Sequence, residues 1–145
     1  MTPVPRILIV EDDPAIRGML ASALRREPLQ VDTAADGAVA LEKIITAQYA
    51  VVLLDLMMPR MSGYVLLDEL RRRRPARQPI VIVMTAFDER ALMSLNPEQV
   101  HASIRKPFDL KLVAELVRDA AQLMQAAGQA AGGDCLTSDE PSATC

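Results

Sequence analysis

Hydrophobic residues gather in five short runs along the chain, separated by polar and turn-forming residues. Short, continuous runs rich in Val, Ile and Leu are typical of strands that are buried on both faces of a parallel sheet. The pattern therefore predicts five strands, the last one weaker than the others: Arg6–Val10, Leu29–Ala34, Ala50–Leu54, Ile80–Met84 and His101–Ile104.

The segments between the runs carry helix-start signals and hydrophobic residues at helical spacing. In the first of these segments, Ile16, Leu20 and Leu24 are four residues apart and should face the core. In the second, we expect Val39, Leu41 and either Ile44 or Ile45 to face inward. The predicted helices begin at Asp13-Pro14, Asp36-Gly37, Ser62-Gly63, Asp88 and Asp109.

Strict alternation of strands and helices predicts an α/β fold. Crossover connections are right-handed and place helices on both faces, so the product is a doubly wound, five-stranded parallel sheet with five helices. Numbering the strands along the chain, the flavodoxin-like order 2-1-3-4-5 is the natural arrangement. This order places the first and third strands side by side.

Composition sets the expected boundaries of the folded domain. A chain of 145 residues with 50% hydrophobic content can fill one core. From Gly128 onward the residues are mostly small or polar, so we predict one domain over residues 1–127 and a disordered polar tail over 128–145. Both cysteines, Cys135 and Cys145, lie in this tail, which favours a reducing compartment.

Charge and hydropathy argue against nucleic-acid and membrane binding. The formal net charge is −3, with both signs interspersed, whereas nucleic-acid binders usually carry a basic face. The basic cluster of Arg71–Arg74 with Arg77 is interpreted as cations at the end of a helix. The hydrophobic runs are too short to span a bilayer and no signal peptide precedes them, so we expect a cytoplasmic protein.

Carboxylates follow two strands that should be neighbours. Glu11-Asp12-Asp13 comes directly after the first run, and Asp55 directly after the third. Asp13 precedes Pro14 and is interpreted as a helix cap. The remaining acids, with no His or Cys beside them, are hard oxygen ligands that suit Mg²⁺ or Mn²⁺ better than zinc.

Two further polar residues are expected at the same edge. Thr85 follows the fourth strand and Lys106 the fifth. A carboxylate beside a divalent cation can attack phosphorus, while a lysine neutralises the phosphoryl oxygens and a hydroxyl bonds to one of them. Each residue alone has an ordinary structural interpretation, but their joint occurrence favours phosphoryl chemistry.

Residues 6 to about 124 resemble the receiver domain of two-component response regulators. The matching segments are Ile7–Pro14, Leu53–Pro59 with Ser62-Gly63, Met84–Ala86 and Lys106–Phe108. The resemblance implies that Asp55 is the phosphoacceptor, that Asp12 and Asp55 bind Mg²⁺ directly, that Glu11 acts through water and that the Met57 carbonyl is a further ligand. It also implies that Lys106 binds the phosphoryl group and that Thr85 is the switch hydroxyl.

The resemblance further implies the partners. The phosphodonor would be a histidine kinase or a phosphotransfer protein, and the output would be contact with a downstream protein. A phosphorylation-dependent homodimer is left open, because the Leu- and Val-rich fifth helix can be core on one face and dimer surface on the other. The chain would be no enzyme beyond its own Mg²⁺-dependent phosphorylation and slow autodephosphorylation.

The sequence departs from the family pattern at the switch and near the attacking water. Ser103 stands where the family usually has Tyr or Phe, and we hypothesise that signalling runs instead through the weak fourth helix, Asp88–Val100. Met57 and Phe87 cannot orient water, so we predict a long-lived aspartyl phosphate. His101 is interpreted as a surface or edge residue.

Two other functions compete with a phosphorylatable receiver. A degenerate receiver could bind a partner constitutively, and Ser103 favours this slightly. A metal-dependent phosphohydrolase would need an acid two residues after its nucleophile, where this chain has Met57, so we rank it last.

Overall fold

The computed structural model describes residues 4–58, 61–73, 78–86 and 95–137. Its five strands form one parallel sheet in the order β2-β1-β3-β4-β5, which confirms the predicted flavodoxin-like topology. The strands are β1 (Arg6–Val10), β2 (Gln30–Ala34), β3 (Val51–Asp55), β4 (Ile80–Thr85) and β5 (Ala102–Arg105).

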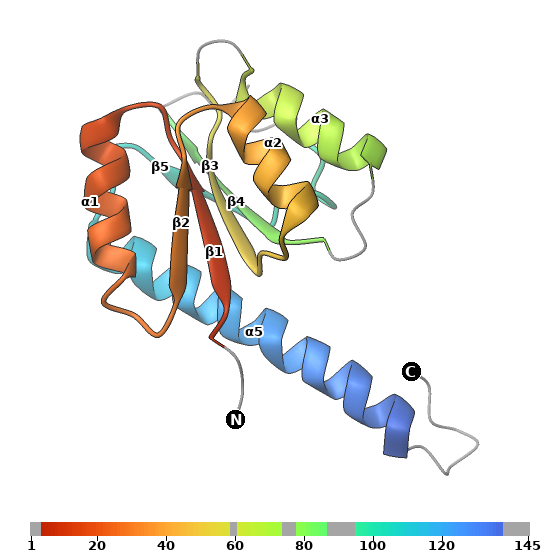
Figure 1. Cartoon of the computed structure of the whole chain (residues 1–145). Coiled ribbons are helices and arrows are strands. Elements are labelled where there is room, and N and C mark those ends of the chain that lie inside the picture. Colours follow the sequence, from red (N-terminus) through yellow and green to blue (C-terminus); the bar gives the residue numbers. More distant parts are fainter. Residues whose placement is uncertain (1–3, 59–60, 74–77, 87–94, 138–145) are drawn as a thin grey trace.

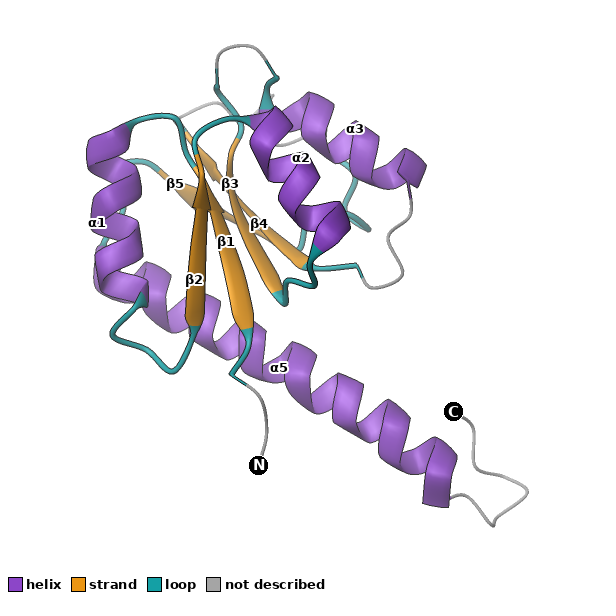
Figure 2. Ribbon diagram, in the orientation of Figure 1, coloured by secondary structure: helices purple, strands orange, loops and turns teal. Residues whose placement is uncertain are grey.

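The described helices cover both faces of the sheet. Helices α1 and α5 lie on one face, and α2 and α3 on the other (Figures 1 and 2). The fourth predicted helix begins at Asp88, and most of it falls on residues 87–94, outside the described residues. The helix bounds are α1 (Pro14–Leu24), α2 (Gly37–Thr46), α3 (Gly63–Arg73) and α5 (Leu110–Thr137).

Alternate strand residues divide the core into two layers. Leu8, Val52 and Leu54 pack with α2 and α3, whereas Ile7 and Leu53 pack with α1 and α5. All five side chains are fully buried. The continuous hydrophobic runs therefore have the predicted cause, because each strand of the sheet's centre buries both of its faces.

The residues that face the core were predicted well for α1 and less well for α2. Leu20 and Leu24 are buried, as expected for α1. In α2, Leu41 and Ile44 are buried, but the prediction for Val39 was wrong, since its side chain is 39% exposed. A helix advances about 100° per residue, so the face that buries Leu41 and Ile44 turns Val39 toward solvent.

Helix α5 extends farther than the sequence suggested. It continues to Thr137, so the backbone of residues 128–137 is helical, where we expected a disordered tail. Residues 128–137 hold three glycines and only two alanines, so their own helix propensity is low; they continue a helix that has already formed, and extending a helix costs less than starting one. Residues 138–145 lie outside the described residues. Within the described part of the chain, no helix combines the length and hydrophobicity needed to cross a bilayer.

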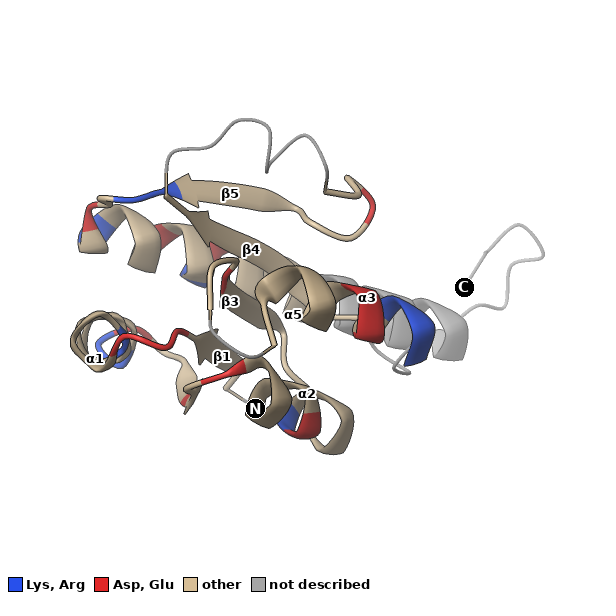
Figure 3. Ribbon diagram, turned by 90° about the horizontal axis from the view of Figure 1, so that it is seen from above, with Lys and Arg blue, Asp and Glu red and all other residues tan. Residues whose placement is uncertain are grey.

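The basic cluster is largely balanced by acids of its own helix. Arg71, Arg72 and Arg73 form ion pairs with Asp68 and Glu69 one turn earlier in α3. Figure 3 shows acidic and basic turns lying next to each other at this end of α3. The described arginines therefore form a paired helix end, as predicted, while Arg74 and Arg77 lie outside the described residues.

A polar cluster joins β1, β2 and the segment before β3. Arg6 Nη2 and the Tyr49 hydroxyl each donate a hydrogen bond of 2.7 Å to Asp32 Oδ2. Burial opposes ionisation of Asp32, but the hydrogen bonds from Tyr49 and Arg6 lower the pKa of Asp32 overall. Burial and the bond to Asp32 raise the pKa of Tyr49 to about 12, so its hydroxyl remains a donor at neutral pH.

We expect this cluster to make stability depend on acid pH. Because folding lowers the pKa of Asp32, its contribution is complete above the unfolded value of about 3.9 and disappears as the pH falls through the lower folded value. We expect a contribution of about 1 kcal/mol, given partial exposure. Urea unfolding followed by circular dichroism should therefore show a smaller loss of stability below about pH 4 in Asp32→Asn than in wild type.

Tyr49→Phe is the matched control, because it removes one donor to Asp32 and keeps the ring. It should give a pH slope between those of wild type and Asp32→Asn. Identical slopes in all three proteins would contradict a stabilising role for the cluster.

Candidate functional site

Three carboxylates meet at the carboxyl edge of the sheet. Glu11 follows β1, and Asp55 is the last residue of the adjacent β3 rather than the residue after it. Glu11 is fully buried and Asp55 is 2% exposed, while Asp12 is half-buried. One oxygen of each lies within 4.8 Å of the others. The sheet order thus brings residues 11, 12 and 55 into one acidic cluster.

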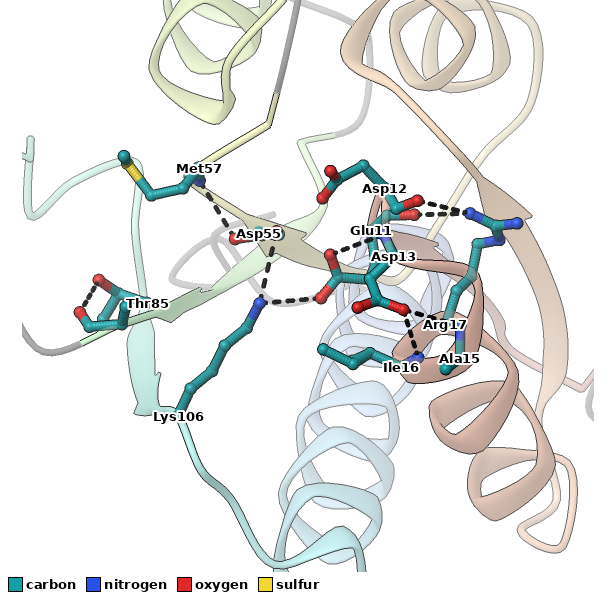
Figure 4. Close-up of polar contacts among 11 residues, drawn as sticks. Glu11, Asp12, Asp13, Ala15, Ile16, Arg17, Asp55, Met57, Thr85 and Lys106 are labelled. Atoms are coloured by element: carbon teal, nitrogen blue, oxygen red, sulfur yellow. Dashed lines mark hydrogen bonds and ion pairs between the residues drawn. The ribbon is translucent and has the colours of Figure 1, made fainter.

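Lys106 lies between two of these acids (Figure 4). Its Nζ is 2.9 Å from Glu11 Oε1 and 3.4 Å from Asp55 Oδ2. Its backbone N–H donates to Thr85 O at 2.8 Å, which continues the β4–β5 ladder by one residue. The end of β5 therefore fixes where the lysine side chain starts, and the ammonium reaches across β4 to the acids.

The electrostatics of the cluster reflect crowded negative charge. Burial, followed by the hydrogen bond and charge of Asp55, raises the pKa of Glu11, while Lys106 opposes this shift. Burial by itself would lower the pKa of Lys106, but Glu11 and Asp55 raise it overall. Lys106 is therefore charged at neutral pH and partly balances the negative charge of Glu11 and Asp55.

The backbone after Asp55 is held by close contacts. The Met57 N–H donates to Asp55 Oδ1 at 3.1 Å, and the Met57 side chain is 67% exposed. The Gly63 N–H donates to Leu56 O at 3.1 Å. A Cβ on Gly63 would lie 2.8 Å from Asp55 O and from Leu56 Cα, and one on Gly37 would lie 2.6 Å from Met61 O. Helices α2 and α3 thus begin directly against the segment that follows Asp55.

Thr85 lies near the cluster, but its hydroxyl does not point to it. The residue is 3% exposed and is the last residue of β4. Its Oγ1 donates a 2.6 Å hydrogen bond to Ala86 O, as Figure 4 shows. The structure therefore brings Glu11, Asp12, Asp55 and Lys106 together and leaves the Thr85 hydroxyl bonded to its own loop.

Helix α1 contributes to the loop that precedes it one residue that the sequence analysis did not single out. Asp13 caps α1 as predicted, accepting from the N–H groups of Ala15 at 2.8 Å and Ile16 at 3.3 Å. Arg17 Nη1 donates to the carbonyl oxygens of Glu11 and Asp12. The only sequence signal was an arginine one turn after a helix cap, which is too common to indicate a role.

The donor set suits a hard divalent cation. The clustered ligands are all carboxylates, with no His or Cys among the described members of the group, which favours Mg²⁺ or Mn²⁺ over zinc. Burial, together with the neighbouring Asp55, raises the pKa of Glu11 despite the contact with Lys106. A bound cation would supply the remaining positive charge, so the residues fit such an ion.

The chain belongs to the response regulator receiver domain family, whose model matches residues 7–118. Acceptance of a phosphoryl group is the general function of this family. The predicted family and fold are thereby confirmed.

Individual relatives agree with this membership. The chain is 39% identical over 105 residues to the sensor histidine kinase TmoS of Ectopseudomonas mendocina, covering 72% of this chain and 11% of TmoS. It is 34% identical over 108 residues to the transcriptional activator PfeR of Pseudomonas aeruginosa, covering 74% of this chain and 35% of PfeR. The chain therefore spans only a minor part of these curated relatives.

A solved structure shows the same fold. The response regulator TrrA of Thermotoga maritima, crystallised in complex with Mg²⁺ and BeF, has a TM-score of 0.69 and 31% identity to this chain. The superposition covers 80% of this chain and 98% of TrrA.

Proposed function

We propose that Asp55 accepts a phosphoryl group in a Mg²⁺-dependent reaction and that its phosphorylation changes a protein-binding surface. The observation that carries this proposal is Lys106, whose ammonium lies between Glu11 and Asp55 inside the acidic cluster. Such an arrangement places a nucleophilic carboxylate beside a fixed positive charge at a sheet edge where ligands of open α/β folds bind.

In the proposed reaction, a carboxylate oxygen of Asp55 attacks the phosphorus of the donor. A new O–P bond forms, the bond from phosphorus to the donor breaks, and its electron pair leaves with the donor, a histidine nitrogen or acetate. Lys106 donates to a phosphoryl oxygen and stabilises its charge. Mg²⁺ held by Glu11, Asp12, Asp55 and the Met57 carbonyl would supply further positive charge.

Thr85 would respond to phosphorylation by changing its hydrogen-bond partner. Its hydroxyl donates to Ala86 O in the structure, so a hydrogen bond to the new phosphoryl group requires that the bond to Ala86 O break. The exchange of acceptors would move the start of the segment that follows β4. The hypothesis that the fourth helix then shifts concerns residues that lie mostly outside the described part of the chain.

Intact-mass spectrometry after incubation with Mg²⁺ and acetyl phosphate tests this proposal. A phosphoryl mass gain that requires Mg²⁺ would support it. Absence of any gain in the wild-type protein would instead favour a constitutive adaptor.

Relatives support partners from two-component signalling. The two curated relatives are named as a sensor histidine kinase and a transcriptional activator. We therefore propose a histidine kinase or phosphotransfer protein as the phosphodonor and a downstream protein as the target, in the cytoplasm. A phosphorylation-dependent homodimer is an alternative. Its interface could include the exposed hydrophobic side chains of α5, since Leu112 and Leu116 are 62% and 37% exposed.

One observation favours the alternative of a constitutive adaptor. Ser103 is exposed on β5, opposite Val83 of β4, and provides no ring that could turn inward. His101 is an exposed edge residue as interpreted above, with Nδ1 accepting from the Val81 N–H at 3.2 Å. We rank the adaptor second, because buried clustered acids are costly for a protein that never uses them.

Met57 is expected to prolong the life of the aspartyl phosphate. Its exposed thioether lies two residues from Asp55 and cannot align an attacking water, whereas an amide at this position could donate to or accept from one. Met57→Asn should therefore shorten the lifetime of the phosphorylated protein severalfold, as followed by loss of the phosphoryl mass after removal of the donor. The companion residue Phe87 lies outside the described residues.

Met19→Asn is the control for this experiment, because Met19 is 50% exposed on α1 and tests the same substitution in another place. It should leave the lifetime unchanged. Equal lifetimes for Met57→Asn and wild type would contradict the role of Met57.

A further inference from the structure

The segment between β1 and α1 carries two of the three clustered acids, and its backbone is tied to α1 by one side chain. Arg17 Nη1 donates to Glu11 O at 3.0 Å and to Asp12 O at 3.4 Å. In Figure 4 the arginine reaches back from α1 to these two carbonyl groups. Glu11 and Asp12 lie between β1 and α1, so their carbonyls fall outside the regular ladders of both elements.

We propose that Arg17 is a positioning residue for the metal site, which it serves by fixing the two peptide groups that aim the carboxylates of Glu11 and Asp12. This inference rests on the proposed function of the acidic cluster. A carbonyl held by a charged donor fixes the plane of its peptide group, and that plane sets the direction of the neighbouring side chains. Arg17 contacts the backbone of this segment through Nη1 of its guanidinium, and these bonds do not involve the carboxylate oxygens of Glu11 and Asp12.

The Glu11 carboxylate is also held by Lys106 Nζ at 2.9 Å and by the Asp13 N–H at 3.3 Å, so the positioning effect of Arg17 should fall mainly on Asp12. The Glu11 N–H donates to Ala34 O at 3.1 Å, which anchors the start of the segment to β2. Asp13 anchors its end as the cap of α1. Asp12 lies between these anchors and is only half-buried, so its orientation depends on the peptide groups that Arg17 holds.

Charge adds to this geometric effect. The guanidinium is always protonated and lies against the backbone carbonyls of two successive acidic residues, Glu11 and Asp12. It therefore offsets part of their mutual repulsion without occupying the cation position. A neutral side chain of similar length would keep the packing of the stem but lose both the hydrogen bonds and the charge.

Calorimetric titration of the metal-free protein with Mg²⁺ or Mn²⁺ tests the proposal directly. Loss of residues that orient metal ligands typically weakens affinity about 10- to 100-fold, so Arg17→Met should bind about tenfold more weakly than wild type. Arg17→Lys can restore one donor and the charge but not the planar fork, and should bind with intermediate affinity. Arg25→Met, at an exposed arginine at the end of the same helix, should bind like wild type.

Each other outcome has a distinct meaning. If wild type binds Mg²⁺ or Mn²⁺ and both Arg17 variants bind the ion with the wild-type affinity, the positioning role is overturned while the proposed function stands. If Arg17→Met only lowers the free energy of unfolding and leaves the affinity of the folded protein unchanged, Arg17 is structural and the inference fails. If wild type binds neither ion, the metal site itself is overturned. Should Arg17→Met not fold, the intermediate affinity expected of Arg17→Lys still decides.

Discussion

Replacement of Asp55 by Asn is expected to abolish phosphorylation by acetyl phosphate. An amide oxygen is a far weaker nucleophile than a carboxylate, and Asn has nearly the same shape, so the fold should be retained. Asp55 is 2% exposed and contacts both the Met57 N–H and Lys106, which an amide oxygen can still approach. Intact-mass spectrometry should show a phosphoryl gain in wild type and none above background in Asp55→Asn.

Asp13→Asn provides the matched control for this loss. Asp13 belongs to the same acidic region in sequence but is exposed and caps α1, and Asn is an equally good cap. This variant should therefore be phosphorylated like wild type. A mass gain that survives in Asp55→Asn would place the modification on another residue and contradict the proposed acceptor.

The second large effect is expected at Gly63, the first residue of α3. No described glycine has a positive φ, so the requirement here is space rather than backbone freedom. A Cβ at this position would lie 2.8 Å from Asp55 O and from Leu56 Cα, both of which are backbone atoms. Gly63→Ala must therefore displace the backbone at Asp55 and should lower the free energy of unfolding by about 1–3 kcal/mol.

The same displacement should also slow phosphorylation, because a shift of Asp55 changes its distance to Lys106. Urea unfolding and the rate of the phosphoryl mass gain measure the two effects separately. Gly18→Ala is the control, since a Cβ on Gly18 in the middle of α1 meets nothing within 4 Å. It should raise the unfolding free energy by about 0.5–1 kcal/mol, as Gly to Ala does inside helices. Destabilisation of both variants to the same extent would contradict the steric explanation.

Much of the fold was predictable because it depends on local patterns. Hydrophobic runs identified all five strands to within one residue at each end, since strands buried on both faces have a continuous signal. Asp13 and Asp36 were recognisable as helix caps from their types and positions alone. The continuation of α5 to Thr137 was not expected, because residues 128–137 offer little to bury and contain three glycines, whereas a helix that has already formed can extend into such a segment at low cost.

By itself, the sequence determined the strand order and which residues reach the carboxyl edge of the sheet. Period and topology dictate these, so Glu11, Asp12, Asp55 and Lys106 could be expected at one place. Only the tertiary structure decided how they meet there: that Lys106 bridges Glu11 and Asp55, that Arg17 holds the carbonyls beside the acids, and that Thr85 turns to Ala86. Side-chain direction and close backbone contacts depend on distances between elements far apart in sequence, which no local pattern encodes.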